Sequence, residues 1–117
     1  MPPRDLRMFM YDVLEACRAI EDVSRGHTLE TYRATRHLRS SIEREFITIG
    51  EALRRAGHVE PGIEDLIPQT PQIIAFRNNL VHRYEVVDDA VVWQIVIEHV
   101  ASLRLNAQRV LDQYSGS

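Results

Sequence analysis

Residues 71–84, PQIIAFRNNLVHRY, predict a helix that ends in a cluster of polar side chains. Pro71 suits the first turn of a helix, because the N–H that proline lacks would have no partner there. An apolar run follows it and provides side chains to bury. Arg77 and His82 then stand in an Arg-x-x-x-x-His spacing, and Tyr84 follows one residue after His82. Arginine, histidine and tyrosine are therefore gathered at one end of a predicted helix.

The rest of the chain predicts three more long helices. Apolar residues recur at helical spacing in three further segments: about 5–24, 34–56 and 88–113. Asp88 is a suitable N-cap for the last helix, and Gly57 is a natural stop for the middle one. Thr28 can cap a short helical turn, and another is expected at residues 63–67. We expect the helix with Arg77 to end between Val81 and Tyr84. The predicted fold is an all-α bundle of four main helices with short helical turns.

Length and composition favour one ordinary globular domain. The chain has 117 residues, of which 44% are hydrophobic and 26% charged, which suits a single domain spanning residues 1–117. No apolar run approaches the roughly 18 residues that a membrane span requires, and the N-terminus does not resemble a signal peptide. Cys17 is the only cysteine, so an internal disulfide is impossible. We therefore expect a cytoplasmic protein that is not bound to a membrane.

All fourteen basic side chains are arginine. Two interpretations remain open: phosphate recognition, which the planar guanidinium favours, and the codon usage of a GC-rich genome. The net charge of -3 argues against non-specific nucleic-acid binding by the whole surface. Residues 31–58 nevertheless hold six arginines and three acidic residues. A local basic surface is therefore possible on the second long helix, although such charge is often only a solvated face.

Metal and cofactor sites are not expected. The sequence has no Gly-rich phosphate loop and no His-x-x-x-His, Glu-x-x-His or Cys-x-x-Cys spacing. The histidines other than His82 stand singly. His99 falls on an apolar face, and we interpret it as a hydrogen-bonded core residue.

The polar cluster at residues 77–84 has two interpretations. Asn78 and His82 are i and i+4 on a helix, so they share a face and can hydrogen-bond. Arg77 lies about 140° around the axis from His82, but its long side chain can reach the same side. Arginine can hold a phosphate and histidine can transfer a proton near neutral pH, which together suffice to cut RNA without a metal. The alternative is a helix C-terminus where Arg77 and His82 interact with the last carbonyls and the helix dipole.

The Arg-Asn-x-x-x-His core with Tyr84 after it resembles the signature of the HEPN superfamily, and most closely HepT, the toxin of HepT/MntA toxin–antitoxin systems. Other features of this sequence fit that family along nearly the whole chain: an Asp-rich first helix, the Ile49-Gly50-Glu51-Ala52 run, the Pro68-x-x-Pro71 spacing, and Asp88-x-x-x-x-Trp93. The motif indicates this family more specifically when it stands at this position in a chain of this length than when it occurs alone.

The resemblance implies a fold, an activity and partners. HepT-like proteins are small all-α homodimers whose two motifs face each other across a cleft, and they act as metal-independent endoribonucleases. Carried over, Arg77 and His82 would be catalytic and Asn78 would support them. Tyr84 matches the tyrosine that a MntA-type nucleotidyltransferase antitoxin AMPylates to silence the toxin. Arg83 departs from the small residue that relatives often carry, and it would either add a phosphate contact or alter the turn before Tyr84.

The expected homodimer also has support in the residues themselves. One His82 per chain could act as base or acid, but not as both at once, and a second copy would complete the pair. In addition, the apolar face of the last helix is wider than packing against one neighbouring helix requires, because it also includes Trp93, Ile97 and Val100. Two alternatives stay open beside the ribonuclease: a non-catalytic helical module that docks a nucleotidyltransferase and presents substrate to it, and a degenerate member that retains only the fold.

Overall fold

The computed structural model describes residues 4–82 and 88–115. Within these ranges the chain is helical and has no strand. The helices are α1 (Arg4–Ser24), α2 (Leu29–Ala34), α3 (Arg36–Val59), α4 (Ile63–Leu66), α5 (Thr70–His82) and α6 (Asp89–Ser115). The prediction of an all-α bundle with four main helices and short helical turns is confirmed.

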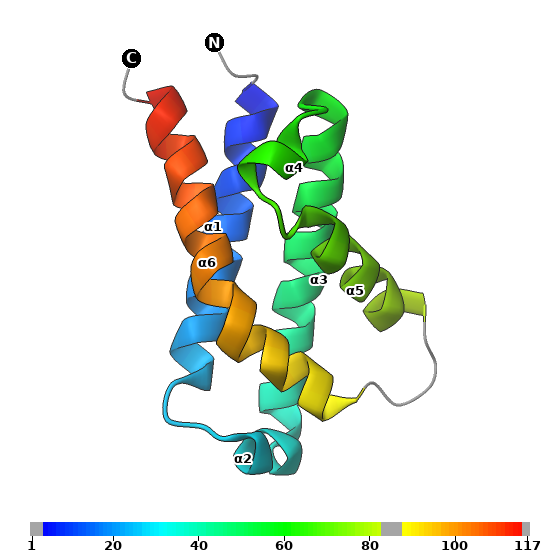
Figure 1. Ribbon diagram of the computed structural model, residues 1–117. Coiled ribbons are helices and arrows are strands. Elements are labelled where there is room, and N and C mark those ends of the chain that lie inside the picture. The colour runs from blue at the N-terminus through cyan, green and yellow to red at the C-terminus, as the bar shows by residue number, and fades with distance from the viewer. Residues whose placement is uncertain (1–3, 83–87, 116–117) are drawn as a thin grey trace.

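The longest helices, α1, α3 and α6, form the body of the molecule (Figure 1). α1 packs against both α3 and α6, and the apolar stripe predicted for α1 is fully buried between them. α5 is placed differently, because it packs chiefly against α3 and projects to one side of the bundle (Figure 1). The position of the predicted polar cluster therefore depends on how α5 is held on α3.

The predicted helix caps at Thr28 and Asp88 are confirmed. The Thr28 hydroxyl accepts a hydrogen bond from the Thr31 N–H at 3.2 Å, and the Thr31 hydroxyl accepts one from the Thr28 N–H at 2.8 Å. The Asp88 carboxylate accepts a hydrogen bond from the Ala90 N–H at 2.9 Å at the start of α6. Each cap gives a partner to a backbone donor that the helix itself leaves unpaired.

Both predicted ends of the second long helix were wrong. Ala34 belongs to α2, and the extended backbone of Thr35 separates it from α3. Gly57 does not stop α3, which continues to Val59. Glu60 is the C-cap and has left helical geometry, with φ -138° and ψ 92°, because the proline that follows disfavours helical backbone in the residue before it.

Two predictions about the last helix were also wrong or only partly right. The side chain of His99 is 29% exposed, and its nearest charged partner is the Glu98 carboxylate at 4.0 Å, so it is not a core residue. Trp93 and Val100 are buried within the protomer, and Trp93 packs on Tyr32 with ring centroids 5.2 Å apart. Of the three residues that widen the apolar face, only Ile97 is exposed, because α2 takes up part of the extra width.

The contact between α3 and α5 combines aromatic packing with a close backbone approach. Phe46 and Phe76 meet edge to face, with ring centroids 5.2 Å apart and planes at 83°, a preferred aromatic geometry. One turn further along α3, Gly50 lies against Arg77. A Cβ added at Gly50 would stand only 2.3 Å from the Arg77 Cβ. The absence of a side chain at Gly50 therefore allows α5 to approach α3 closely at the Cβ of Arg77.

We expect Gly50→Ala to destabilise the protein by about 1–3 kcal/mol, because the added methyl group overlaps the root of a side chain rather than its flexible end. Gly57→Ala is the matched control in the same helix. Its Cβ would meet Ile63 at an ordinary 3.7 Å, so the substitution should stabilise the helix by roughly 0.5–1 kcal/mol. Urea unfolding of both variants measures the two effects, and a Gly50→Ala protein as stable as Gly57→Ala would contradict the close approach.

Candidate functional site

Arg77 is the most constrained member of the predicted cluster. Its side chain is 20% exposed and leaves α5 toward α3, where Nη2 lies 3.2 Å from a carboxylate oxygen of Glu51. Its Nη1 donates a hydrogen bond to the side-chain oxygen of Asn78 at 3.0 Å. Its Nε is buried and has no partner within the described part of the protein. Arg77 is thus fixed at two points while one donor stays unpaired.

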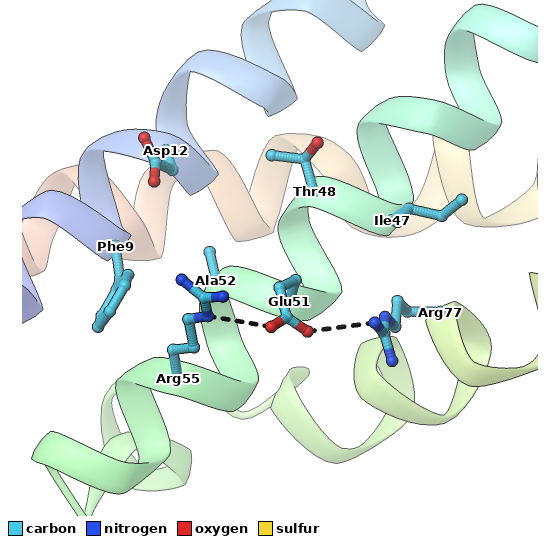
Figure 2. A pocket seen from close by; sticks show the side chains of 8 residues that line it. All are labelled: Phe9, Asp12, Ile47, Thr48, Glu51, Ala52, Arg55 and Arg77. Atoms are coloured by element: carbon cyan, nitrogen blue, oxygen red, sulfur yellow. Dashed lines mark hydrogen bonds and ion pairs between the residues drawn. The ribbon is translucent and has the colours of Figure 1, made fainter. Parts of the chain in front are cut away.

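Glu51 is shared by three arginines. Arg54 donates to both carboxylate oxygens, at 3.1 and 2.8 Å, and Arg55 donates from Nε at 3.0 Å. Together with Arg77, these groups place three guanidinium charges around one carboxylate (Figure 2 shows the bonds from Arg55 and Arg77). The hydrogen bond from Arg54, followed by the other arginine contacts, lowers the pKa of Glu51 to about 2. Glu51 therefore stays ionised at neutral pH, and the cluster keeps an excess of positive charge.

A recess of about 290 Å³ adjoins Arg77 and Glu51. Its wall is built by residues from three helices: Phe9 and Asp12 from α1, Ile47, Thr48, Glu51, Ala52 and Arg55 from α3, and Arg77 from α5 (Figure 2). The arginines and carboxylates stand beside aromatic and aliphatic surface. The recess therefore combines a charged part with an apolar part, as small-molecule sites commonly do.

The other predicted site residues are placed only in part. His82 is the last residue of α5 and is exposed to solvent. Asn78 is also exposed, and its side chain accepts a hydrogen bond from Arg77 rather than pairing with His82. Arg83 and Tyr84 lie outside the described residues. The structure thus links Arg77 with Asn78 and puts His82 on the same helix.

Glu51 was missed as a site residue. The sequence showed it only as part of the run Ile49–Ala52, with no sign that it pairs with Arg77. The signal that could have found it is a glycine, Gly50, beside the apolar stripe of a long helix, followed directly by the acidic Glu51. A glycine there permits a close neighbour, and an acid beside it can bind a cation on that neighbour.

Neither a metal-binding cluster nor a membrane-spanning helix is present among the described residues. Within residues 4–82 and 88–115, no group of three or more His, Cys, Asp or Glu side chains is arranged to hold a metal ion. None of the described helices combines the length and the apolar character needed to cross a bilayer.

Comparisons with known proteins agree with the resemblance seen in the sequence. The HepT-like ribonuclease family matches residues 13–110, so the chain belongs to this family. "Putative RNase MJ0127" of Methanocaldococcus jannaschii is 26% identical over 99% of this chain and 95% of its own length. "Probable ribonuclease HepT" of Thermococcus cleftensis is 27% identical over 86% of this chain and 91% of its own length. No solved structure matches the chain significantly. The expected ribonuclease class is confirmed.

The low pKa of Glu51 generates a prediction about stability and pH. An acid whose pKa is depressed in the folded state stabilises the fold above its ordinary pKa, and this stabilisation disappears as the pH falls toward the folded value. For Glu51 the ordinary value is 4.5 and the folded value about 2. We therefore expect the wild type to exceed Glu51→Gln in stability above about pH 5, and this advantage to shrink steadily down to about pH 3.

Urea unfolding at a series of pH values measures this difference. Glu15→Gln is the control, because Glu15 pairs with the exposed Arg18, at 3.4 Å on the surface of α1, and with no other of the described residues. Its substitution should change stability little at any pH. If the difference in unfolding free energy between the wild type and Glu51→Gln is the same at pH 3 and pH 7, the lowered pKa of Glu51 is contradicted.

Proposed function

We propose that this protein is a cytoplasmic, metal-independent endoribonuclease toxin in which Arg77 and His82 are the catalytic residues. The observation that carries the proposal is the fixed position of Arg77. This arginine stands on the same helix as His82 and is held by Glu51 of α3, which also binds Arg54 and Arg55. Membership of the HepT-like ribonuclease family supports the same reaction class.

The chemistry needs few groups, because RNA supplies its own nucleophile. The ribose 2′-oxygen attacks the adjacent phosphorus, a new P–O2′ bond forms, and the bond from phosphorus to the 5′-oxygen breaks. One His82 accepts the 2′-OH proton, and a protonated histidine gives a proton to the leaving 5′-oxygen. The products are a 2′,3′-cyclic phosphate end and a 5′-OH end. Histidine titrates near neutral pH and suits both roles.

Arg77 would stabilise the charge on the non-bridging phosphate oxygens. Its contacts with Glu51 and Asn78 engage Nη2 and Nη1, and they hold the guanidinium in place before substrate arrives. A donor fixed in advance gains most in the transition state, because it needs no reorganisation when charge develops. Asn78 supports Arg77 in this arrangement.

A homodimer would supply the second histidine. The part of α6 that does not face the core exposes Val91, Ile97 and Leu105, with Ile97 65% exposed. These apolar side chains offer a surface for a second copy. In the proposed dimer the two His82 residues share one cleft. Light scattering on the purified protein should give a mass near twice 13.5 kDa, whereas a mass near 13.5 kDa at micromolar concentration would argue against a shared cleft.

Purified protein should cleave cellular RNA in the presence of EDTA and leave cyclic phosphate ends. His82→Ala should lower turnover by about 10²–10⁴-fold, the usual contribution of a general acid or base. Arg77→Lys should lower it by roughly 10²–10³-fold, because a point charge does not replace a two-pronged donor. His27→Ala is the matched control, since His27 is an exposed histidine of the turn before α2, where its ring pairs with Thr31, and it should leave turnover unchanged.

Gel analysis measures how fast each variant cleaves the RNA, and chemical mapping identifies the ends that the cleavage leaves. Cleavage that survives His82→Ala at the wild-type rate, or that requires Mg²⁺, would refute the mechanism.

A cytoplasmic ribonuclease must be kept inactive until it is needed. We propose that AMPylation of Tyr84, two residues after His82, inactivates this one. Transfer of AMP from ATP to the phenol oxygen forms a phosphodiester bond and releases pyrophosphate. The attached AMP brings a phosphate charge and a purine close to His82 and Arg83, where both would compete with RNA. The partner that fits is a MntA-type nucleotidyltransferase antitoxin.

Incubation with the cognate nucleotidyltransferase and ATP should add mass in AMP units and abolish RNA cleavage. Tyr84→Phe should gain no mass, while Tyr11→Phe, which alters an exposed tyrosine of α1, should be modified like the wild type. Intact-mass spectrometry measures the change. Equal modification of Tyr84→Phe would show that the acceptor lies elsewhere.

A further inference from the structure

The recess beside Arg77 is larger and more varied than phosphate binding alone requires. A phosphate needs donors, and Arg77 and Arg55, which both bind Glu51, provide them in the wall of the recess. The same recess also has Phe9, Ile47 and Ala52 in its wall. Apolar and aromatic surface next to an arginine cluster suits a ligand that is charged at one end and flat and apolar at the other.

Phe9 and Arg77 lie toward opposite sides of this recess, with Glu51 between them (Figure 2). Phe9 is half-buried and packs against the core, so its ring is held by the protein while part of it borders the recess. A fixed aromatic ring can stack on the face of any nucleobase, and single-stranded RNA is commonly bound in this way.

Asp12 adds a polar group on the same side as Phe9. Its carboxylate is exposed, borders the recess, and forms no hydrogen bond or ion pair with the described residues. By contrast, the carboxylate of Glu51 is occupied by three arginines. A free carboxylate repels phosphate, but it accepts hydrogen bonds from the amino groups of bases.

We propose that this recess is a nucleobase subsite, in which Phe9 stacks on the base next to the scissile phosphate and Asp12 selects a base with an amino group. The ligand class is a single-stranded RNA nucleotide carrying guanine, adenine or cytosine rather than uracil. Arg77 faces the phosphate end of the nucleotide, and Arg55 lies between Glu51 and Phe9 (Figure 2). The inference rests on the proposed function for the position of the scissile phosphate, while the recess itself does not depend on catalysis.

The test measures binding rather than cleavage and uses the full-length His82→Ala protein, which keeps the recess. Fluorescence anisotropy compares a short uridine-only RNA with versions that carry one central adenosine, cytidine or guanosine. We expect the amino-bearing RNAs to bind roughly tenfold more tightly, the discrimination given by a well-placed base contact. Asp12→Ala should remove this preference.

The controls separate base recognition from charge and from folding. Glu15→Ala removes the same charge from an exposed position of α1 outside the recess, so it should keep the preference even if overall affinity changes. Phe9→Leu should weaken all four RNAs by about tenfold, since it fills space without a flat ring, and Phe9→Tyr should restore binding. Circular dichroism confirms that each variant is folded.

The outcomes distinguish this inference from the proposed function. A preference for amino-bearing RNA that Asp12→Ala abolishes and Glu15→Ala retains supports the subsite, even if the wild type cuts no RNA. Wild-type cleavage together with equal binding of all four RNAs overturns the subsite and leaves the ribonuclease standing. A recess variant that changes only the mass of the assembly, and not RNA binding, would mean that the recess serves a protein interface instead.

Discussion

The close approach of α5 to α3 at Gly50 is the constraint on which the site depends. α5 packs chiefly on one neighbour, so its position is set by a small contact: the Phe46–Phe76 pair, the Gly50–Arg77 approach and the Glu51–Arg77 ion pair. The aromatic pair gives apolar burial, and glycine removes the methyl group that would separate the helices. The ion pair then fixes the direction of the arginine. A helix held elsewhere would not bring Arg77 to Glu51.

The charges of the site follow from this geometry. One carboxylate among three guanidinium groups cannot neutralise them, so it orders Arg77 and leaves positive charge for a phosphate. Exposed ion pairs contribute little to stability, and those of Arg54 and Arg55 are largely exposed. The side chains of Arg77 and Glu51 are more shielded, at 20% and 27% exposure. This pair is therefore better suited than its neighbours to fix the position of a side chain. The cluster is locally positive although the whole chain has a net charge of -3.

Much of the fold could be predicted from sequence because helical spacing and caps are local. The stripe of α1, the caps at Thr28 and Asp88, and the placement of Arg77 and His82 on one helix all depend on residues close together in the chain. The end of α3 was missed because Pro61 acts on its neighbour more strongly than Gly57 acts on its own position. Pairing between helices is not local, so nothing in the spacing revealed that Glu51 holds Arg77. His99 was misjudged for the same reason, since an apolar face on one helix does not say which part of it a neighbour covers.

A double-mutant cycle between Glu51 and Arg77 tests most directly whether the ion pair serves catalysis. Single-turnover RNA cleavage is measured for the wild type, Glu51→Gln, Arg77→Lys and the double variant. If Glu51 acts by holding Arg77, Glu51→Gln slows the wild type but changes little once Arg77 is lysine, so the two effects are not additive. If Glu51→Gln slows both proteins by the same factor, Glu51 acts independently of Arg77, and the account of the site is wrong.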